Sequence, residues 1–250
     1  MKLALIALVS CLALSVKSYT YMGGVTTKRI HSTYWTDKAM LPRYKNHNIP
    51  VVDTQSTDLI CRSPDMTFQA MPFRIDAGDF ARVTWKSDPD TYPYHNVEPK
   101  GPCTFWLAPA SSKGKGKVWS KIHQYINNGK DGVETKWCTD IITANKGFYD
   151  VPIPTGLAKG TYILRSEIID IRDASVSNYD DFSMGPRFHP NCLLIDVYSI
   201  GDDPLKSSES ILEVYKPYYK SPMLPETTSY SQLKLPGLSL YPHIMLEAEA

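Results

Sequence analysis

The sequence lacks the patterns that mark several common classes of protein. It has no CxxC pair and no His/Cys cluster at the spacing of zinc ligands, so a structural zinc site is not expected. It has no Asn-x-Ser/Thr triplet and therefore no acceptor for N-glycosylation. It also has no recognisable nucleophile elbow, phosphate-binding loop or paired-carboxylate motif. These absences argue against most hydrolases and nucleotide-binding enzymes.

The sequence has no large excess of positive or negative charge. The 27 basic and 26 acidic side chains nearly cancel, which leaves a formal net charge of +1. The sequence has no basic stripe, and a protein that binds nucleic acid usually carries one. Nucleic acid is therefore not an expected partner.

Apolar runs long enough to cross a membrane are also missing. The N-terminal run, residues 3–16, is shorter than the roughly 20 residues that a membrane helix needs. It follows a basic residue and ends in small ones, which is the pattern of a secretory signal peptide. We expect residues 1–18 to be removed, so that a secreted chain begins at Tyr19; a cut after Ser15 is the alternative. Residues 19–250 then suit a single β-sandwich domain.

Four cysteines remain once the signal peptide, with Cys11, is removed. They are Cys61, Cys103, Cys138 and Cys192. An even number in a secreted chain predicts two disulfides, and the residues alone leave all three connectivities open.

Short alternating segments rich in β-branched and aromatic residues predict strands. The predicted strands are residues 20–27, 80–86, 103–110, 147–154, 160–171 and 191–200. The 19 prolines fall mostly between these segments, which argues against long helices. Residues 118–129 are the one stretch for which a helical turn is expected, with a loop as the alternative. The pattern predicts an all-β fold, an antiparallel β-sandwich with long loops.

The composition changes after residue 200. Residues 201–250 are rich in proline, serine and tyrosine, and the alternation is lost. They form either a disordered tail or an extended strap laid over one sheet. Ile211, Leu212 and Val214 favour the strap, because disordered segments contain fewer apolar residues.

Seven stretches, in order along nearly the whole mature chain, carry a family pattern. They are LPRYKNHNIPVVDTQSTDLICR (41–62), AGDFARVTWK (77–86), KGPCTFWLAPA (100–110), VWSKIHQ (118–124), PTGLAKGTYILRSEIIDIRDAS (154–175), RFHPNCLLIDV (187–197) and TSYSQLKLPGLSLY (228–241). Together they resemble the auxiliary activity family 9 lytic polysaccharide monooxygenases, fungal copper enzymes that oxidatively cut cellulose. The resemblance implies an immunoglobulin-like sandwich. It also implies the disulfide Cys61–Cys192, which leaves Cys103–Cys138 as the second pair.

The resemblance implies a copper site whose ligands this sequence does not keep. In the family, copper is held by the N-terminal amine, the imidazole of that first histidine and a second imidazole, a nitrogen donor set that suits both redox states. An axial tyrosine and an outer-shell histidine and glutamine complete the site. In this chain the two brace histidines become Tyr19 and Pro99, the outer-shell pair becomes Arg172 and Arg187, and the axial tyrosine becomes His189. No catalytic residue is therefore assigned.

Several single residues at or near the implied copper site, and Tyr230 near the C-terminus, have two interpretations each. Arg172 and Arg187 are either ordinary ion-paired residues or a source of positive charge where a metal would sit. His189 is either a buried imidazole bonded to backbone or, with His95, a weak metal ligand. Tyr230 either stacks on a sugar ring or packs within the strap.

Two functions follow from the resemblance. The first is a secreted, monomeric, non-catalytic relative that has no metal cofactor. It would bind cellulose or a related β-glucan or xylan, or act at a cell surface. The alternative is a copper monooxygenase that cleaves cellulose with a rebuilt site made by the Tyr19 amine, His95 and His189.

Overall fold

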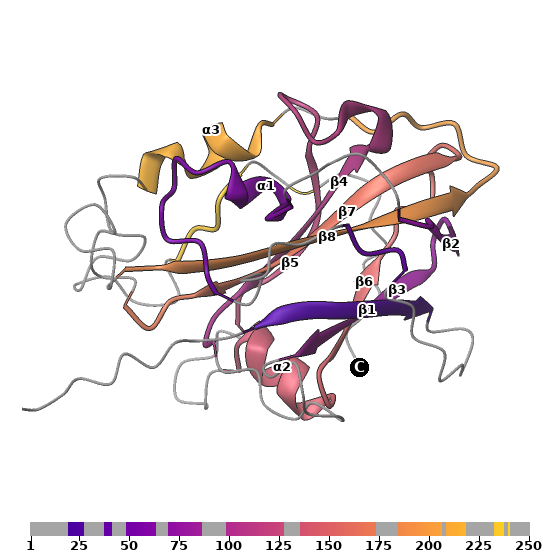
Figure 1. Ribbon diagram of the computed structural model, residues 1–250. Coiled ribbons are helices and arrows are strands. Elements are labelled where there is room, and N and C mark those ends of the chain that lie inside the picture. The colour runs from indigo at the N-terminus through magenta and orange to yellow at the C-terminus, as the bar shows by residue number, and fades with distance from the viewer. Residues whose placement is uncertain are drawn as a thin grey trace, which may run out of the picture.

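Two β-sheets pack face to face in the computed structural model of the chain (Figure 1). The structure describes residues 20–27, 38–41, 49–63, 70–86, 99–127, 136–173, 185–206, 209–218, 233–237 and 240. Within these ranges the predicted all-β sandwich is confirmed, and its core lies between the two sheets.

The smaller sheet has three strands in the order β1–β3–β6, and the larger has five in the order β2–β8–β7–β4–β5. The strands are β1 (Tyr21–Thr27), β2 (Phe73–Asp76), β3 (Phe80–Lys86), β4 (Cys103–Pro109), β5 (Ser120–Tyr125), β6 (Phe148–Pro152), β7 (Gly160–Asp170) and β8 (Arg187–Tyr198). All neighbouring strands run antiparallel except β2 and β8, which are parallel. The larger sheet is therefore mixed, which the sequence pattern did not predict.

The two longest strands, β7 and β8, pair along almost their whole length and are buried on both faces. Their inner faces meet the smaller sheet. Their outer faces lie beneath a second apolar cluster that includes residues of α1 (Asp58–Cys61) and α3 (Ile211–Tyr215). Because both of their faces are buried, the sequences of these strands are nearly continuous runs of apolar residues.

Within the described ranges, parts of the predicted strap pack against the outer face of the larger sheet. In Figure 1, α3 lies over this sheet beside α1. Tyr215 is fully buried there, and Leu233 and Leu235 pack into the same cluster. The segment is partly helical, since α3 is followed by the 3₁₀ turn η2 (Lys216–Tyr218). The division into a signal peptide and a single domain stays a prediction.

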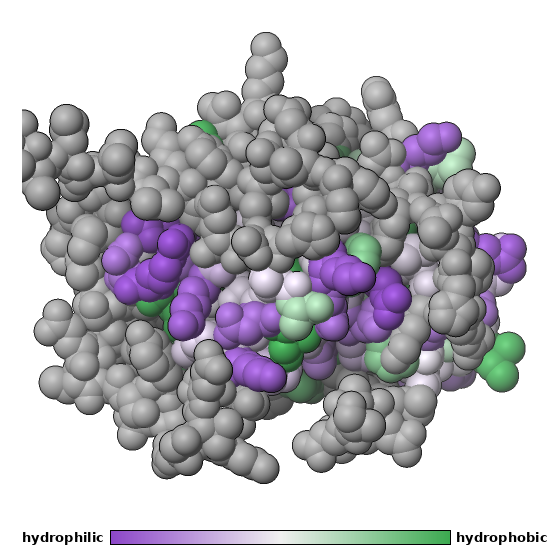
Figure 2. All heavy atoms as spheres, turned by 90° about the horizontal axis from the view of Figure 1, so that it is seen from below, coloured by the Kyte–Doolittle hydropathy of each residue, from purple (hydrophilic) through white to green (hydrophobic). Residues whose placement is uncertain are grey.

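In the described ranges the helices are few and short. Besides α1 and α3 there are α2 (Cys138–Ala144) and the 3₁₀ turn η1 (Ala110–Ser112). In the part of the chain that the structure describes, no helix is long and apolar enough to cross a membrane. Figure 2 views the molecule from the side of β1 and α2, where hydrophilic side chains alternate with smaller apolar areas.

The helical turn expected for residues 118–129 is wrong. Residues 120–125 form β5, which pairs antiparallel with β4 at the edge of the larger sheet. Alternation explains the strand: Ile122 faces the core between the sheets, whereas Lys121 lies by the Trp106 ring on the other face. The edge of β4 provides the pairing partner of this strand, and the local sequence pattern does not reveal that partner.

Both disulfides have the connectivity that the resemblance implies. Cys61 of α1 is bonded to Cys192 of β8, and Cys103 of β4 to Cys138 of α2. Each one ties a short helix to the larger sheet. The first closes a span of 131 residues and the second a span of 35.

An aromatic stack joins the two sheets near the edge formed by β5. Phe105, His123 and Tyr149 come from β4, β5 and β6, and their ring centroids are 5.0–5.8 Å apart. His123 Nε2 and the Tyr149 hydroxyl share a hydrogen bond of 2.9 Å. Burial lowers the pKa of His123 from its ordinary value to about 4 and raises that of Tyr149. The imidazole is therefore neutral in the folded protein at pH 7.

This histidine should make the folded protein sensitive to acid. Above about pH 6.5, His123 is neutral in both the folded and the unfolded chain and contributes no pH dependence. As the pH falls from there toward 4, only the unfolded chain takes up the proton, so stability falls by up to about 1.4 kcal/mol per pH unit. His123→Phe keeps a ring in the stack but cannot titrate. Between pH 7 and pH 5 the parent should lose about 2 kcal/mol more than the variant in urea unfolding. Equal losses would contradict the assignment.

Candidate functional site

The positions that the resemblance implies as a copper site lie at one end of the larger sheet. There β7 ends at Asp170 and β8 begins at Arg187, and the register pairs these two residues. We define the candidate site by the described side chains that gather at this end: Arg62, Pro99, Asp170, Arg172, Arg187 and His189.

Pro99 is brought to this end by backbone pairing. The amide of Ile171 donates to the carbonyl of Lys100, and the amide of Ile169 donates to that of Pro102, both at 3.0 Å. Between them, Gly101 lies so close to β7 that a Cβ there would meet the carbonyl oxygen of Ile169 at 2.1 Å. Pro99 itself is buried and offers no polar side-chain group.

Asp170 is the centre of an ion-pair network. Its side chain is fully buried and accepts hydrogen bonds from Nε and Nη2 of Arg172. Arg187 Nη1 lies 2.7 Å from a carboxylate oxygen of Asp173 and 3.9 Å from one of Asp170. The two arginines are therefore held by two carboxylates of the same chain. Both arginines are ion-paired, as the first interpretation has it. That they supply positive charge where a metal would sit stays a prediction.

His189 is buried on the inner face of β8, and only 2% of its surface is exposed. Nδ1 donates to the carbonyl oxygen of Thr20 at 3.2 Å. Burial lowers the pKa of His189 to about 4; Asp170 and the bond to Thr20 oppose the shift, whereas Arg62 and Arg172 add to it. The ring is thus neutral with its proton on Nδ1, and Nε2 carries a lone pair. That nitrogen has no hydrogen-bond partner among the residues that the structure describes.

Arg62 is a member of the site that sequence reasoning missed. It directly follows Cys61, and its left-handed backbone (φ 50°) ends α1. Its Nε and Nη1 atoms are buried and, within the described ranges, neither has a hydrogen-bond partner. Burial lowers the pKa of Arg62, and the charge of Asp58 only partly opposes this. No local pattern marks an arginine after a cysteine as a site residue.

Three predicted site residues lie outside the described residues. They are Tyr19, His95 and Tyr230. Their roles as the first residue of the mature chain, a weak metal ligand and a sugar-stacking residue stay predictions.

The described part of the site does not fit the nitrogen donor set of the copper brace. It offers one imidazole, and the carboxylates of Asp170 and the nearby Asp173 are bound to arginines. Copper in that brace needs two imidazoles and an amine. Across the described residues, no three His, Cys, Asp or Glu side chains are grouped so that they could hold a metal ion.

Comparison with known proteins places the chain in a family. The model of Auxiliary Activity family 9 (formerly GH61) matches residues 14–231. An AA9 family lytic polysaccharide monooxygenase A of Collariella virescens is 32% identical over 161 residues, which are 62% of this chain and 56% of that protein. One of Phanerochaete carnosa is 26% identical over 223 residues, 86% of this chain and 78% of that protein. The chain spans about half the length of the curated relatives that match first.

Solved structures show the same fold. CvAA9A has a TM-score of 0.74 at 25% identity, over 89% of this chain and 98% of that one. A cellulose-active polysaccharide monooxygenase from M. thermophila has a TM-score of 0.63 at 19% identity, over 90% and 100% of the two chains. The second likeness concerns the fold alone.

Proposed function

The chain belongs to Auxiliary Activity family 9, and we propose that it is a secreted, non-catalytic member that binds a cell-wall polysaccharide or acts at a cell surface. The observation that carries this proposal is the ion-pair network of Asp170, Arg172 and Arg187. It occupies the positions where the resemblance places the outer-shell histidine and glutamine of the copper site.

Electrostatics supports the loss of copper. A divalent cation at the candidate site would approach three guanidinium groups, and the two nearby carboxylates already neutralise Arg172 and Arg187. To coordinate Asp170, the cation would have to displace an arginine from a fully buried carboxylate. Taking a counterion from a buried carboxylate in this way is costly. Pro99 adds no ligand in compensation.

Copper titration tests this proposal. We expect isothermal titration of the mature chain with Cu²⁺ to show no one-to-one site of nanomolar affinity. A chelator should also leave the melting temperature unchanged, because a metal that binds only the folded state would stabilise it by mass action. A copper-binding member of the same family, measured alongside, is the control. A nanomolar isotherm, or melting several degrees lower after chelation, would contradict the proposal.

Polysaccharide binding is tested separately. The mature chain should co-sediment with at least one of cellulose, xylan or mixed β-glucan, as a monomer. Tyr230→Ala should weaken that binding if the ring stacks on a sugar face, and Tyr230→Phe should not. Absence of binding to every wall polysaccharide would favour action at a cell surface instead.

One observation favours the alternative, a copper monooxygenase with a rebuilt site. His189 Nδ1 is bonded to the carbonyl of Thr20, the residue that follows the expected mature N-terminus, and Nε2 has no hydrogen-bond partner among the described residues. If the Tyr19 amine and His95 joined it, three nitrogens would be available to copper. Release of oxidised oligosaccharides in the presence of copper, a reductant and oxygen or peroxide, and its loss in His189→Phe, would establish this activity.

A further inference from the structure

An exposed surface lies on the outer face of the larger sheet, at the end opposite the candidate site (Figure 1). At this end β2 pairs with the last residues of β8, and β7 begins. The apolar cluster on the outer face includes Leu194 of β8, whereas the outward-facing residues beyond it are at least partly exposed. We call this area the β2–β8 surface and define it by Arg74, Lys159, Thr161, Asp196 and Tyr198.

Two cations of the β2–β8 surface meet on one aromatic ring. Cζ of Arg74 lies 3.5 Å from the centroid of the Tyr198 ring, and Nζ of Lys159 lies 5.0 Å from the same centroid. Arg74 is brought there by β2 and Lys159 by the start of β7. Two positive charges are thus held close together by a contact that the ring makes with both.

Neither cation is neutralised within the described ranges. The ion pairs found there involve other residues, and both Arg74 and Lys159 are exposed. Stacking on an aromatic ring holds a guanidinium group in place, so less side-chain entropy is lost when its N–H groups bind a carboxylate. The surface is therefore prepared to bind an anion.

Carboxylates of the same surface restrict which anion fits. Asp196 is the register partner of Arg74, but its hydrogen bond is with Thr161, whose Oγ1 donates to Oδ1 of Asp196 at 3.5 Å. Asp76, which is in register with Tyr198, is a second carboxylate at this end. Carboxylates accept hydrogen bonds from hydroxyl groups, and they repel a ligand that carries negative charge alone. A suitable ligand therefore has acid groups and hydroxyl donors side by side.

We propose that the β2–β8 surface binds an acidic polysaccharide, a chain of uronic acids. Its carboxylates accept from Arg74 and Lys159, and its hydroxyl groups donate to Asp196. A chain fits better than a single sugar acid, because each exposed ion pair is weak and the surface extends across three adjacent strands. The inference goes beyond the proposed function, since it uses no residue of the candidate site and does not depend on whether copper or a neutral polysaccharide binds.

The test compares polymers that differ in one property. The mature chain is titrated with polygalacturonate, with its fully methyl-esterified form, which has no charge, and with polyglutamate, which has carboxylates but no hydroxyl groups. We expect polygalacturonate to bind about tenfold more tightly than either of the others, and its binding to weaken as the ionic strength rises to about 0.15 M. Polyglutamate binding of equal strength would assign the surface to an acidic protein segment and overturn the proposal. Equal binding of the esterified form, or no binding of polygalacturonate, would also overturn it.

Variants identify the groups that bind. Arg74→Gln and Lys159→Gln should each weaken binding of polygalacturonate, and the double variant should bind it no better than the methyl ester. Lys146→Asn is the matched control, because it also removes an exposed positive charge but lies between α2 and β6 of the smaller sheet. Asparagine suits the left-handed backbone there (φ 58°), so this variant should fold and bind like the parent. A loss equal to that of Lys159→Gln would show an effect of net charge alone and contradict the proposal.

An exposed isoleucine next to the β2–β8 surface distinguishes a sugar chain from an apolar partner. Ile200 follows Tyr198 by two residues and is fully exposed. Ile200→Ser should leave polygalacturonate binding unchanged, because the proposed contacts are all polar. A loss as large as that of the double cation variant would mean that an apolar contact dominates, and the proposal would then be wrong.

Two further measurements keep this outcome separate from that of the proposed function. Co-sedimentation with cellulose, xylan or β-glucan should be the same for the parent and for the double variant at Arg74 and Lys159; a loss there would contradict recognition of charge. In the unaltered protein, the Nε–H resonance of Arg74 should shift when oligogalacturonate is added and not when its methyl ester is added. A resonance that stays in place while polygalacturonate binds would locate the binding elsewhere and overturn the proposal.

Discussion

Replacing Arg165 by methionine is expected to lower the free energy of unfolding by about 3–5 kcal/mol. Arg165 and Glu167 lie side by side on β7, and neither side chain is exposed. Arg165 Nη2 donates to Glu167 at 2.7 Å, and Arg165 also donates to the carbonyls of Leu59 and Ile60 in α1. Without the guanidinium group, Glu167 would keep a buried charge with no counterion. Urea unfolding at pH 7 measures the loss.

The partners of Glu167 allow a graded control. Its carboxylate also accepts from the hydroxyls of Tyr215 in α3 and Thr104 in β4. Tyr215→Phe removes one hydrogen bond to a charged group and should cost about 1.5–3 kcal/mol, less than Arg165→Met. The double variant Arg165→Met with Glu167→Leu should recover much of the loss, because no unpaired charge remains. A double variant less stable than Arg165→Met alone would contradict this account.

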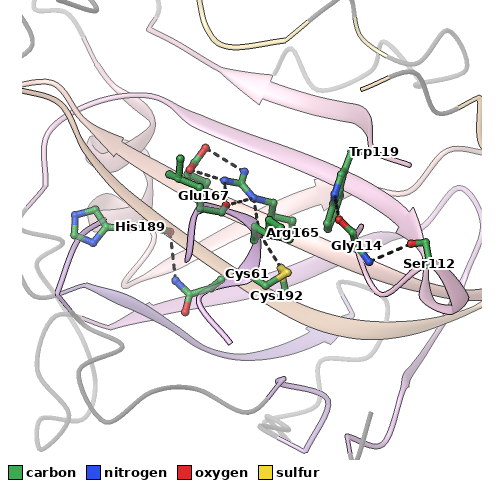
Figure 3. Close-up of a disulfide and its surroundings, with 11 residues drawn as sticks. Cys61, Ser112, Gly114, Trp119, Arg165, Glu167, His189 and Cys192 are labelled. Carbon is green, nitrogen blue, oxygen red and sulfur yellow. Dashed lines mark hydrogen bonds and ion pairs between the residues drawn. A yellow bond between two sulfur atoms is a disulfide. The ribbon is translucent and has the colours of Figure 1, made fainter. Parts of the chain in front are cut away.

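The network also explains how the strap is held. Figure 3 shows Arg165 and Glu167 next to each other and close to the Cys61–Cys192 disulfide, with His189 apart from them. Through Arg165 the network binds α1, and through Tyr215 it binds α3. The two short helices are thus fixed to β7 by polar contacts beneath the apolar cluster. Neither helix is long enough to be stable by itself.

The fold could be predicted from the sequence because most of its strands show the residue alternation typical of a β-strand. Residues 80–86 were predicted with the bounds of β3, and the prediction for 103–110 differs from β4 by a single residue. The prediction failed where the decisive partner is distant in sequence. β5 became a strand by pairing with β4, and β2 joined the sheet by a parallel contact with β8. The local periodicity of the sequence indicates neither of these two strand pairings.

Only the positions of some candidate-site residues could be predicted from the sequence. The resemblance identified Pro99, Arg172, Arg187 and His189 as replaced positions. The pairing of Arg172 and Arg187 with carboxylates depends on the β7–β8 register and on the turn after Asp170, which no motif encodes. Within the described ranges, Nε and Nη1 of Arg62 are buried without hydrogen-bond partners. Such a property arises from packing and leaves no pattern in the residues.

Removing the disulfide between Cys61 and Cys192 should have an effect as large as that of the Arg165 substitution. Cys61→Ser with Cys192→Ser opens a covalent loop of 131 residues. The chain-entropy estimate for a loop of this size is about 5 kcal/mol, and measured losses are often smaller. For a domain of this size each kcal/mol corresponds to roughly 2–4 °C, so the melting temperature should fall by about 10 °C or more. Thermal unfolding of the parent and the double variant measures the difference.

The structure adds a reason for this disulfide to matter beyond loop entropy. Cys61 is the last residue of α1, and Arg165 reaches the carbonyls of Leu59 and Ile60 in that same helix. When α1 is released, Arg165 loses these acceptors, so the two effects should be coupled rather than additive. Cys103→Ser with Cys138→Ser, which opens a loop of 35 residues, is the matched control and should cost less, about 4 kcal/mol by the same estimate. The account fails if the Cys61 and Cys192 variant melts like the parent. The coupling fails if combining that variant with Arg165→Met costs the sum of the two separate losses.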